Sequence, residues 1–415
     1  MNPTLRPVEI HSIHRNGQRE LALRDPLGLT DKIVVLPQAL APMLALCDGS
    51  RGVSELHAAL LVRAGLSLPR ALIEQVIDHL DAALLLDNEH FAQAYDEAVR
   101  AYRTAPFRAP ALAGSSYPAD ARQLHQLLEG YLAQSGGGHA HPPPGDGIDA
   151  PVAGLVSPHI DYLRGGRVYA SVWGQAAAAA RAAELAVIFG TDHNGGTGRI
   201  TLTHQSYATP YGVMPAATEL VEAVVAAIGP DQAFGEEFHH HREHSVELAT
   251  VWLHHMRVGQ PCPVLPILCG SFQHFIDQKL DPADDPILGA ALEALRRSVA
   301  GRKALIVAAA DLAHMGPAFH DPFVIDHVRY LHLKAADDIL LQTLIQPDAA
   351  AFFRIISAEG NRRSICGLPP IYLTLRLLGP HASGQLTGYE RCPADEDNTS
   401  FVSICGAVFR GQSGG

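Results

Sequence analysis

The sequence has 415 residues, enough for two or three domains. Hydrophobic residues make up 47% of it and charged residues 18%, so the chain can bury a large core and disorder should be local. The formal net charge of −12 predicts no basic face, and we therefore expect no binding to nucleic acid or to anionic membranes.

The six cysteines include no C-x-x-C pair and do not suggest a disulfide framework in a chain of this length. We interpret them as mostly reduced, which favours a cytoplasmic protein; Cys392 is assigned to a polar loop and Cys405 to the last strand. The N-terminal residues lack the apolar segment of a signal peptide, and there is no run of about 18 apolar residues. We expect neither a secretion signal nor a membrane span.

Residues 1–105 are predicted to form a small, mainly helical domain. Helical apolar spacing flanks a DGSRG turn at 48–52 and recurs from Leu68 to Leu86, after which DNEHF suggests a turn into a short strand. The turn segment LCDGSRGVSEL and the helix end LDAALLL resemble the winged-helix-like peptide chaperone PqqD and related peptide-binding domains. A generic helical cap is the alternative.

A second domain is predicted over residues 106–412, with a flexible loop at 135–147. The loop sequence, SGGGHAHPPPGDG, contains too much glycine and proline for regular structure. We interpret it as a solvated loop.

From Pro151 onward, short apolar runs alternate with longer helical stretches. The predicted strands lie in PVAGLVSPH, ELAVIFGTDHN, CPVLPILCGS and KALIVAAADLAH. The predicted helices lie around 168–183, 218–228, 245–256 and 285–299. Continuously apolar strands that alternate with helices predict an α/β fold, with a mostly parallel sheet covered by helices on both faces.

Three of these strands end in titratable residues. The pairs, in chain order, are His159 with Asp161, Asp192 with His193, and Asp311 with His314. In open α/β sheets, ligands bind beyond the carboxyl ends of the strands. Three strand ends that each supply a histidine predict one shared pocket.

Two further segments are candidates for the same pocket. His244, in FHHHREHSVEL, opens the predicted helix 245–256, and a histidine there lies near oriented N–H groups that favour a neutral imidazole. His240 stands four residues before it, as in zinc proteases, but the glutamate expected after the first histidine is missing. Cys366 precedes a helix with two prolines, where a cysteine is either a reactive ligand or nucleophile or a small residue at a turn.

Residues 108–412 resemble the Memo family, the B component of the AmmeMemoRadiSam grouping. The matching segments, in order, are AGSSYPADARQLHQLLEGYL, SPHIDYLRGG, FGTDHN, TPYG, EHSVEL, VLPILCG, AADLAHMG and ICGLPPI. The departures include Ser116, where the family often has tryptophan, and Ile160 with Asp161 in the second segment.

The resemblance implies the fold of class III extradiol dioxygenases, which use non-haem iron. It also implies that His159, His193 and Cys366 bind the metal. His244, Asp311 and His314 correspond to further pocket residues, which we assign as candidate catalytic groups. The dioxygenases complete their site with a carboxylate, whereas this chain has Cys366, whose thiolate suits iron or copper. Fe(II) is the expected cofactor and copper the alternative.

The same residues suggest how the site is supported. Asp161 and Asp192 neighbour the expected ligands, so either could orient an imidazole. His314 could act as general acid or base, and Asp311 could fix its tautomer or instead face a different part of the pocket.

Three functions remain open from the sequence. The first is metal-dependent redox or dioxygenase-like chemistry on an unidentified small molecule or modified peptide, with a radical S-adenosylmethionine (SAM) enzyme and an AMMECR-like protein as partners. The second is a non-enzymatic peptide- or protein-binding module with a degenerate pocket. The third is a hydrolase with Cys366 as nucleophile and His244 or His314 as base.

Overall fold

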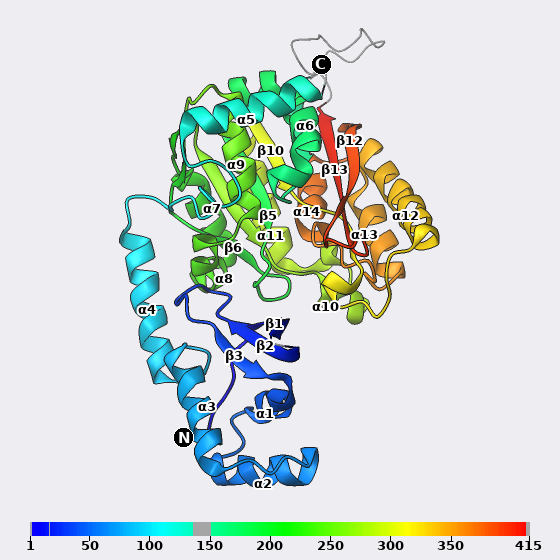
Figure 1. Ribbon diagram of the computed structural model, residues 1–415. Helices are drawn as coiled ribbons and strands as arrows, with labels where there is room; N and C mark the ends of the chain where they lie inside the picture. Colours follow the sequence, from blue (N-terminus) through cyan, green and yellow to red (C-terminus); the bar gives the residue numbers. More distant parts are fainter. Residues whose placement is uncertain (1, 16, 136–150, 412–415) are drawn as a thin grey trace. The chain divides into compact units, whose positions relative to one another are not determined.

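The computed structural model describes residues 2–15, 17–135 and 151–411 (Figure 1). The chain divides into two compact units, Met1–Thr104 and Ala105–Gly415. Apart from Ser135, the predicted loop at 135–147 lies outside the described residues. None of the helices in the described ranges is long and apolar enough to cross a membrane.

The N-terminal unit combines an antiparallel sheet with helices around a small core. The sheet order is β1-β2-β3, with β1 at Glu9–Arg15, β2 at Gln18–Arg24 and β3 at Val34–Pro37. The helices are η1 (Gln38–Leu40), α1 (Ala41–Leu46), α2 (Val53–Ala64), α3 (Arg70–Ala82) and α4 (Glu89–Thr104). The sheet was not predicted. β1 is exposed along nearly its whole length and therefore lacks an alternating pattern. β3 does alternate buried and exposed residues, but it is only four residues long and lies in a segment that was interpreted as helical.

The short strand predicted after Leu86 is wrong, because α4 begins at Glu89. The side chain of Asn88 accepts a hydrogen bond from the backbone N–H of Phe91 at 3.0 Å, which caps the first turn of the helix. Asparagine is a strong helix N-cap, so the segment held a start signal that the strand interpretation overlooked.

The second unit is built on one central sheet in the order β11-β13-β4-β10-β5-β9-β6, with β12 paired to β13. Its strands are β4 (Val152–Ser157), β5 (Leu185–Thr191), β6 (Ile200–Leu202), β9 (Val264–Cys269), β10 (Ala304–Ala309), β11 (His314–Met315), β12 (Ser383–Pro393) and β13 (Phe401–Arg410). The four central strands β4, β10, β5 and β9 are parallel, and the outer strands pair antiparallel. The predicted α/β fold with a mostly parallel sheet is confirmed.

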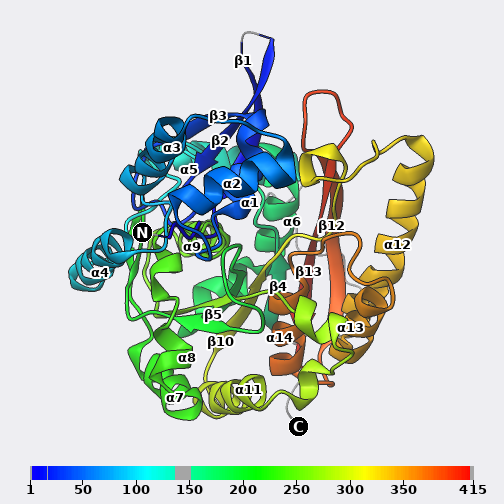
Figure 2. The same ribbon diagram turned by 90° about the horizontal axis from the view of Figure 1, so that it is seen from below.

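Helices cover both faces of this sheet, as predicted (Figure 2). One core layer holds α5 (Ala121–Gln134), α6 (Tyr162–Ala182) and α9 (Ser245–Met256). The opposite layer holds α7 (Thr218–Ile228), α11 (Pro286–Val299), α12 (His327–Ile345), α13 (Ala349–Ala358) and α14 (Leu368–Leu378). Short elements complete the unit: β7 (Tyr207–Thr209), β8 (Gly212–Met214), α8 (Pro230–Phe234), η2 (Glu237–His241), α10 (Gln273–Asp277), η3 (Pro282–Asp284) and η4 (Pro317–Phe319).

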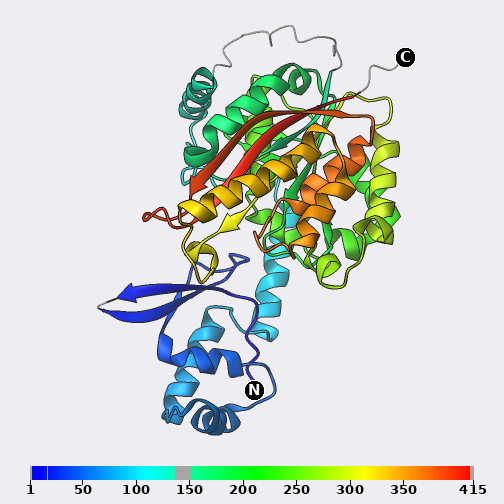
Figure 3. The same ribbon diagram turned by 90° about the vertical axis from the view of Figure 1, so that its right-hand side faces the viewer.

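The long antiparallel pair β12–β13 closes one side of the sheet, with α12 packed beside β12 (Figure 3). Cys405 lies in β13, as predicted. The assignment of Cys392 to a polar loop is wrong, since it lies near the end of β12 and is buried. Because β12 is half-buried along its length, its residues do not alternate, which removed the usual strand signal.

Strand order determines where the titratable strand ends meet. β10 is inserted between β4 and β5, although it follows both in the chain. The three strands are parallel, so their carboxyl ends lie side by side at one edge of the sheet. The segments that follow them carry His159, His193 and Asp311.

Candidate metal centre

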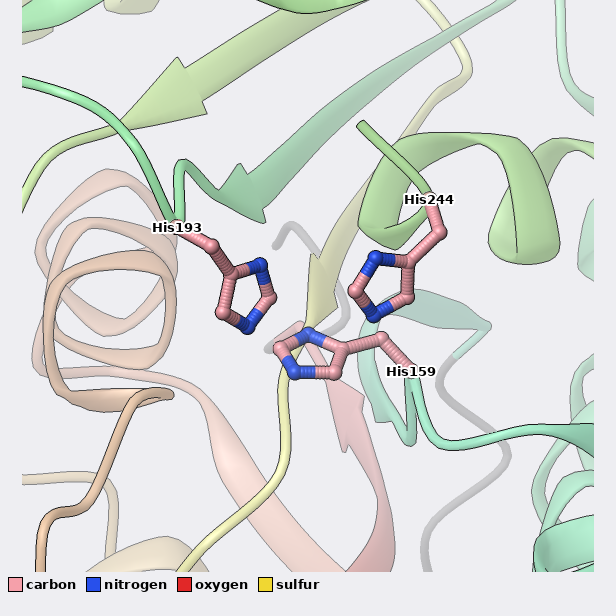
Figure 4. Close-up of side chains that lie close together, drawn as sticks. All are labelled: His159, His193 and His244. Carbon is pink, nitrogen blue, oxygen red and sulfur yellow. The ribbon is translucent and has the colours of Figure 1, made fainter. Parts of the chain in front are cut away.

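Three imidazoles converge at this edge of the sheet (Figure 4). His159 follows β4, His193 follows β5, and His244 is the residue before α9. Their ring centroids lie 5.1 Å apart for His159 and His193, 5.4 Å for His159 and His244, and 4.8 Å for His193 and His244. One ligand nitrogen of each ring lies within 4.8 Å of the others, close enough for a single metal ion to bind all three.

The Nδ1 atom of each ring already has a partner. His159 Nδ1 lies 3.0 Å from the carbonyl oxygen of Ala309, and His193 Nδ1 lies 3.0 Å from a carboxylate oxygen of Glu243. His244 Nδ1 lies 3.1 Å from the other oxygen of Glu243. A ring that donates its Nδ1 proton to such an acceptor keeps the Nε2 lone pair for a metal. The imidazoles are therefore oriented as metal ligands.

Glu243 is the residue that organises this arrangement, and the sequence reasoning did not assign it a role. Its carboxylate also accepts hydrogen bonds from the backbone N–H groups of His193, His244 and Ser245, at 3.0, 2.8 and 3.0 Å. Burial opposes its ionisation, but His193 and His244 hold its pKa well below the usual value. Glu243 is thus a buried carboxylate that fixes two candidate ligands at once. The available signal was its position directly before His244.

Asp311 supports the third imidazole. One of its oxygens accepts a hydrogen bond from the backbone N–H of His159 at 2.8 Å, and the other lies 3.8 Å from His159 Nε2. His314 Nδ1 instead lies 3.1 Å from the carbonyl oxygen of Leu312. Asp311 therefore positions His159, and the idea that it fixes the tautomer of His314 is wrong.

Cys366 brings a sulfur atom into the same cluster. Its Sγ lies 3.3 Å from His159 Nε2. Burial opposes ionisation of the thiol, but His159 and then His314 hold its pKa well below the ordinary value. Burial likewise opposes protonation of His159, yet Cys366 and Asp311 raise the pKa of that imidazole to about 9. His159 and His314 therefore favour the thiolate, which is the form in which cysteine binds metals.

Two glycines let the ligand-bearing segments approach the sheet. A Cβ on Gly367 would lie 2.2 Å from the carbonyl oxygen of Asp311, which instead accepts a hydrogen bond from the Gly367 N–H at 3.0 Å. A Cβ on Gly190 would lie 2.5 Å from the hydroxyl oxygen of Ser245. Any side chain at these positions would push Cys366 or His244 away from the strand ends.

The remaining predicted residues lie outside the cluster or at its margin. Asp192 pairs with His239 Nδ1 at 2.9 Å, and Asp161 caps α6 through the N–H of Arg164 at 3.1 Å. Both carboxylates are engaged away from the ligand imidazoles, so the expectation that they orient His159 or His193 is wrong. His314 is half-buried in β11, with its ring centroid 5.0 Å from that of Phe319, and influences Cys366 by its charge.

The set of donors suits a transition metal. Imidazole nitrogen and thiolate sulfur are ligands of zinc, iron and copper, and a closed calcium or magnesium site would need oxygen ligands. A family model described as "Memo-like protein" matches residues 108–408, which include every residue of the cluster. The chain belongs to the Memo family.

Relatives of this Memo-family chain occur in bacteria and archaea. A MEMO1 family protein of Aquifex aeolicus is 24% identical over 94% of this chain and 96% of its own length. A MEMO1 family protein of Archaeoglobus fulgidus is 27% identical over 73% of this chain and 99% of its own length. A MEMO1 family protein of Thermus thermophilus is 29% identical over 65% of this chain and 74% of its own length. Because the Aquifex alignment covers 94% of this chain, it includes most of the N-terminal unit, which therefore has a counterpart in that protein.

His240 is buried and is not one of the three clustered imidazoles. Tyr207 Oη lies 2.6 Å from its Nδ1, and its Nε2 lies 3.1 Å from the carbonyl oxygen of Thr201. Both ring nitrogens are therefore occupied, and the pair His240 and His244 does not form a zinc-protease site. Burial lowers the pKa of His240 to about 3.

This low pKa predicts a loss of stability in acid. Because the unfolded chain takes up the proton near pH 6.5 and the folded chain only near 3, the contribution of His240 is complete above pH 6.5 and is lost as the pH falls towards 3. The loss is about 2 kcal/mol at pH 5. The free energy of unfolding, measured with urea at pH 7.5 and at pH 5, should differ less between the two pH values for His240→Gln than for the wild type. Equal differences would contradict this explanation.

Proposed function

We propose that this protein binds Fe(II) through His159, His193 and Cys366 and uses it for redox chemistry on a small molecule or modified peptide. The observation that carries the proposal is the Cys366 sulfur atom 3.3 Å from an imidazole nitrogen of His159, beside two further imidazoles whose Nδ1 atoms lie close to carboxylate oxygens. Copper is the alternative metal, because it accepts the same donors.

The protein's own groups have separable tasks in this proposal. Glu243 holds His193 and His244, and Asp311 holds the backbone of His159. His314 lies near enough to stabilise the thiolate and is the candidate for moving a proton to or from a bound substrate. His244 is either a fourth ligand or a second proton-transfer group. The bound metal would supply one-electron chemistry and an open coordination position.

Metal analysis after anaerobic purification tests the proposal. The wild type should contain near-stoichiometric iron, and His159→Ala, His193→Ala and Cys366→Ser should each lose most of it. The matched controls are His204→Ala, an exposed histidine paired with Glu222, and Cys262→Ser, a buried cysteine outside the cluster; both should keep the metal. Stoichiometric iron in all three cluster variants would refute the proposal.

The same variants separate the redox proposal from a binding module. We propose a radical SAM enzyme and an AMMECR-like protein as partners, supported by the family resemblance alone. Capture of either partner by the wild type but not by the cluster variants would couple binding to the metal centre. Equal capture by wild type and variants would favour a module that works without the metal.

A further inference from the structure

A second cluster of metal-ligating side chains lies outside the metal centre. His125 and Glu129 stand one helical turn apart on α5, and His255 lies in the last turn of α9. One ligand atom of each residue lies within 4.8 Å of the others. Residues four apart on a helix share one face, so α5 presents its two donors together towards His255.

The distance between two ligand atoms of this cluster is close to that between ligands of one ion. His255 Nε2 lies 3.1 Å from a carboxylate oxygen of Glu129, and the rings of His125 and His255 have centroids 5.2 Å apart. Two ligands bound at about 2.0–2.1 Å in a tetrahedral site are separated by about 3.3 Å. A cation could therefore enter between these side chains with little movement.

The buried histidine is held in the orientation that a ligand needs. His255 Nδ1 lies 3.1 Å from the hydroxyl oxygen of Tyr211, which leaves Nε2 to face Glu129 and His125. The side chain of His255 is only 3% exposed, whereas that of Glu129 is 54% exposed. One rigid ligand and two accessible ones make a site that solvent can reach.

This cluster is separate from the candidate metal centre. His244 precedes the first turn of α9 and His255 lies in its last, so the two are about 16 Å apart along a helix that rises about 1.5 Å per residue. No sulfur ligand belongs to the second cluster among the described residues. Any metal bound there would have a different ligand set.

We propose that His125, Glu129 and His255 form a second, solvent-accessible site for a divalent first-row cation, with Zn²⁺ as the favoured ion. Two imidazoles and one carboxylate are a common zinc ligand set, and they leave a position for water. The ion would link α5 to α9 across the surface of the second unit. The net charge of −12 favours cation binding in general.

Co²⁺ titration of the full chain tests this site with a spectroscopic signature. The background carries Cys366→Ser and His193→Ala, and also His139→Ala with His141→Ala so that the loop supplies no imidazole. We expect a visible d–d band without thiolate-to-cobalt charge transfer. Added Zn²⁺ should displace the Co²⁺ and abolish the band. His125→Ala and Glu129→Gln should each weaken binding at least about tenfold.

The exposed pair His204 and Glu222, 3.4 Å apart, provides the matched control, because no third metal-ligating side chain among the described residues completes a cluster with it. His204→Ala should leave the Co²⁺ spectrum and affinity unchanged. Since His125 and Glu129 are exposed, their variants should fold, and circular dichroism will verify this. Absence of the d–d band, or equal affinity in His125→Ala, Glu129→Gln and the parent, would overturn the proposal. Neither result depends on whether the first centre binds iron.

Discussion

Replacing Glu247 by alanine is expected to destabilise the second unit by about 3–5 kcal/mol, because it leaves a buried guanidinium without its counter-ion. Glu247 pairs with Arg108, and both side chains are almost completely buried. Its carboxylate also accepts hydrogen bonds from the N–H groups of Ala111 and Leu112, at 2.8 and 2.9 Å, and from the hydroxyl of Tyr117. Urea unfolding monitored by tryptophan fluorescence, with the midpoint and slope analysed together, would measure the loss.

A double variant shows whether the loss comes from the unpaired charge. If it does, Arg108→Met with Glu247→Met should be more stable than either single variant, because it removes both charges together. Arg108 also donates to the carbonyl oxygens of His240 and Glu243, at 2.8 and 2.9 Å, so some loss should persist. A cost below about 1 kcal/mol for Glu247→Ala would place the pair among weak surface ion pairs and contradict the expectation.

The second large effect is expected at Glu243. Changing it to alanine removes the acceptor of His193 and His244 and of three backbone N–H groups. Loss of a group that orients metal ligands commonly weakens metal binding about 10–100-fold. Glu243→Gln keeps the size of the side chain but loses the charge. Its metal affinity should lie between those of the wild type and Glu243→Ala. Competition with a chromophoric chelator would give the affinities.

Two comparisons make the Glu243 result specific. Glu222→Gln, at the exposed partner of His204, should leave metal affinity unchanged. Unfolding curves should be recorded for each variant, so that affinity is compared only under conditions where the protein is folded. Wild-type metal affinity in a folded Glu243→Ala protein would show that the imidazoles are held without the carboxylate.

The strands and helices of the second unit could be predicted because its central elements are long and strongly patterned. β4, β5, β9 and β10 lie within the four apolar runs, and α7 and α9 have the predicted bounds. The first strand of the N-terminal sheet was missed because it gains pairing without burial, so its apolar residues carry no period that distinguishes a strand from a loop. β3 alternates, but its four residues are too few to separate it from the helical spacing assigned to that segment.

The candidate site was only partly predictable for a different reason. His159 and His193 follow buried strands, so their position at one sheet edge follows from the general rule for α/β folds. Spacing left Cys366 undecided, and only the family resemblance suggested it as a ligand. Glu243 acts on His193, which is distant in the chain, and on neighbouring backbone groups. Its position directly before His244 was a local signal, but its contacts with His193 depend on tertiary structure and leave no local pattern in a single sequence.

The insertion of β10 between β4 and β5 has a consequence for how the protein folds. His159, His193 and Cys366 cannot meet until β10 is in place and α14 has packed on it, which requires most of the second unit. Contacts between such distant parts of a chain form late and slowly. A metal ion bound at the candidate metal centre would therefore mainly lower the rate of unfolding and would have little effect on the rate of folding.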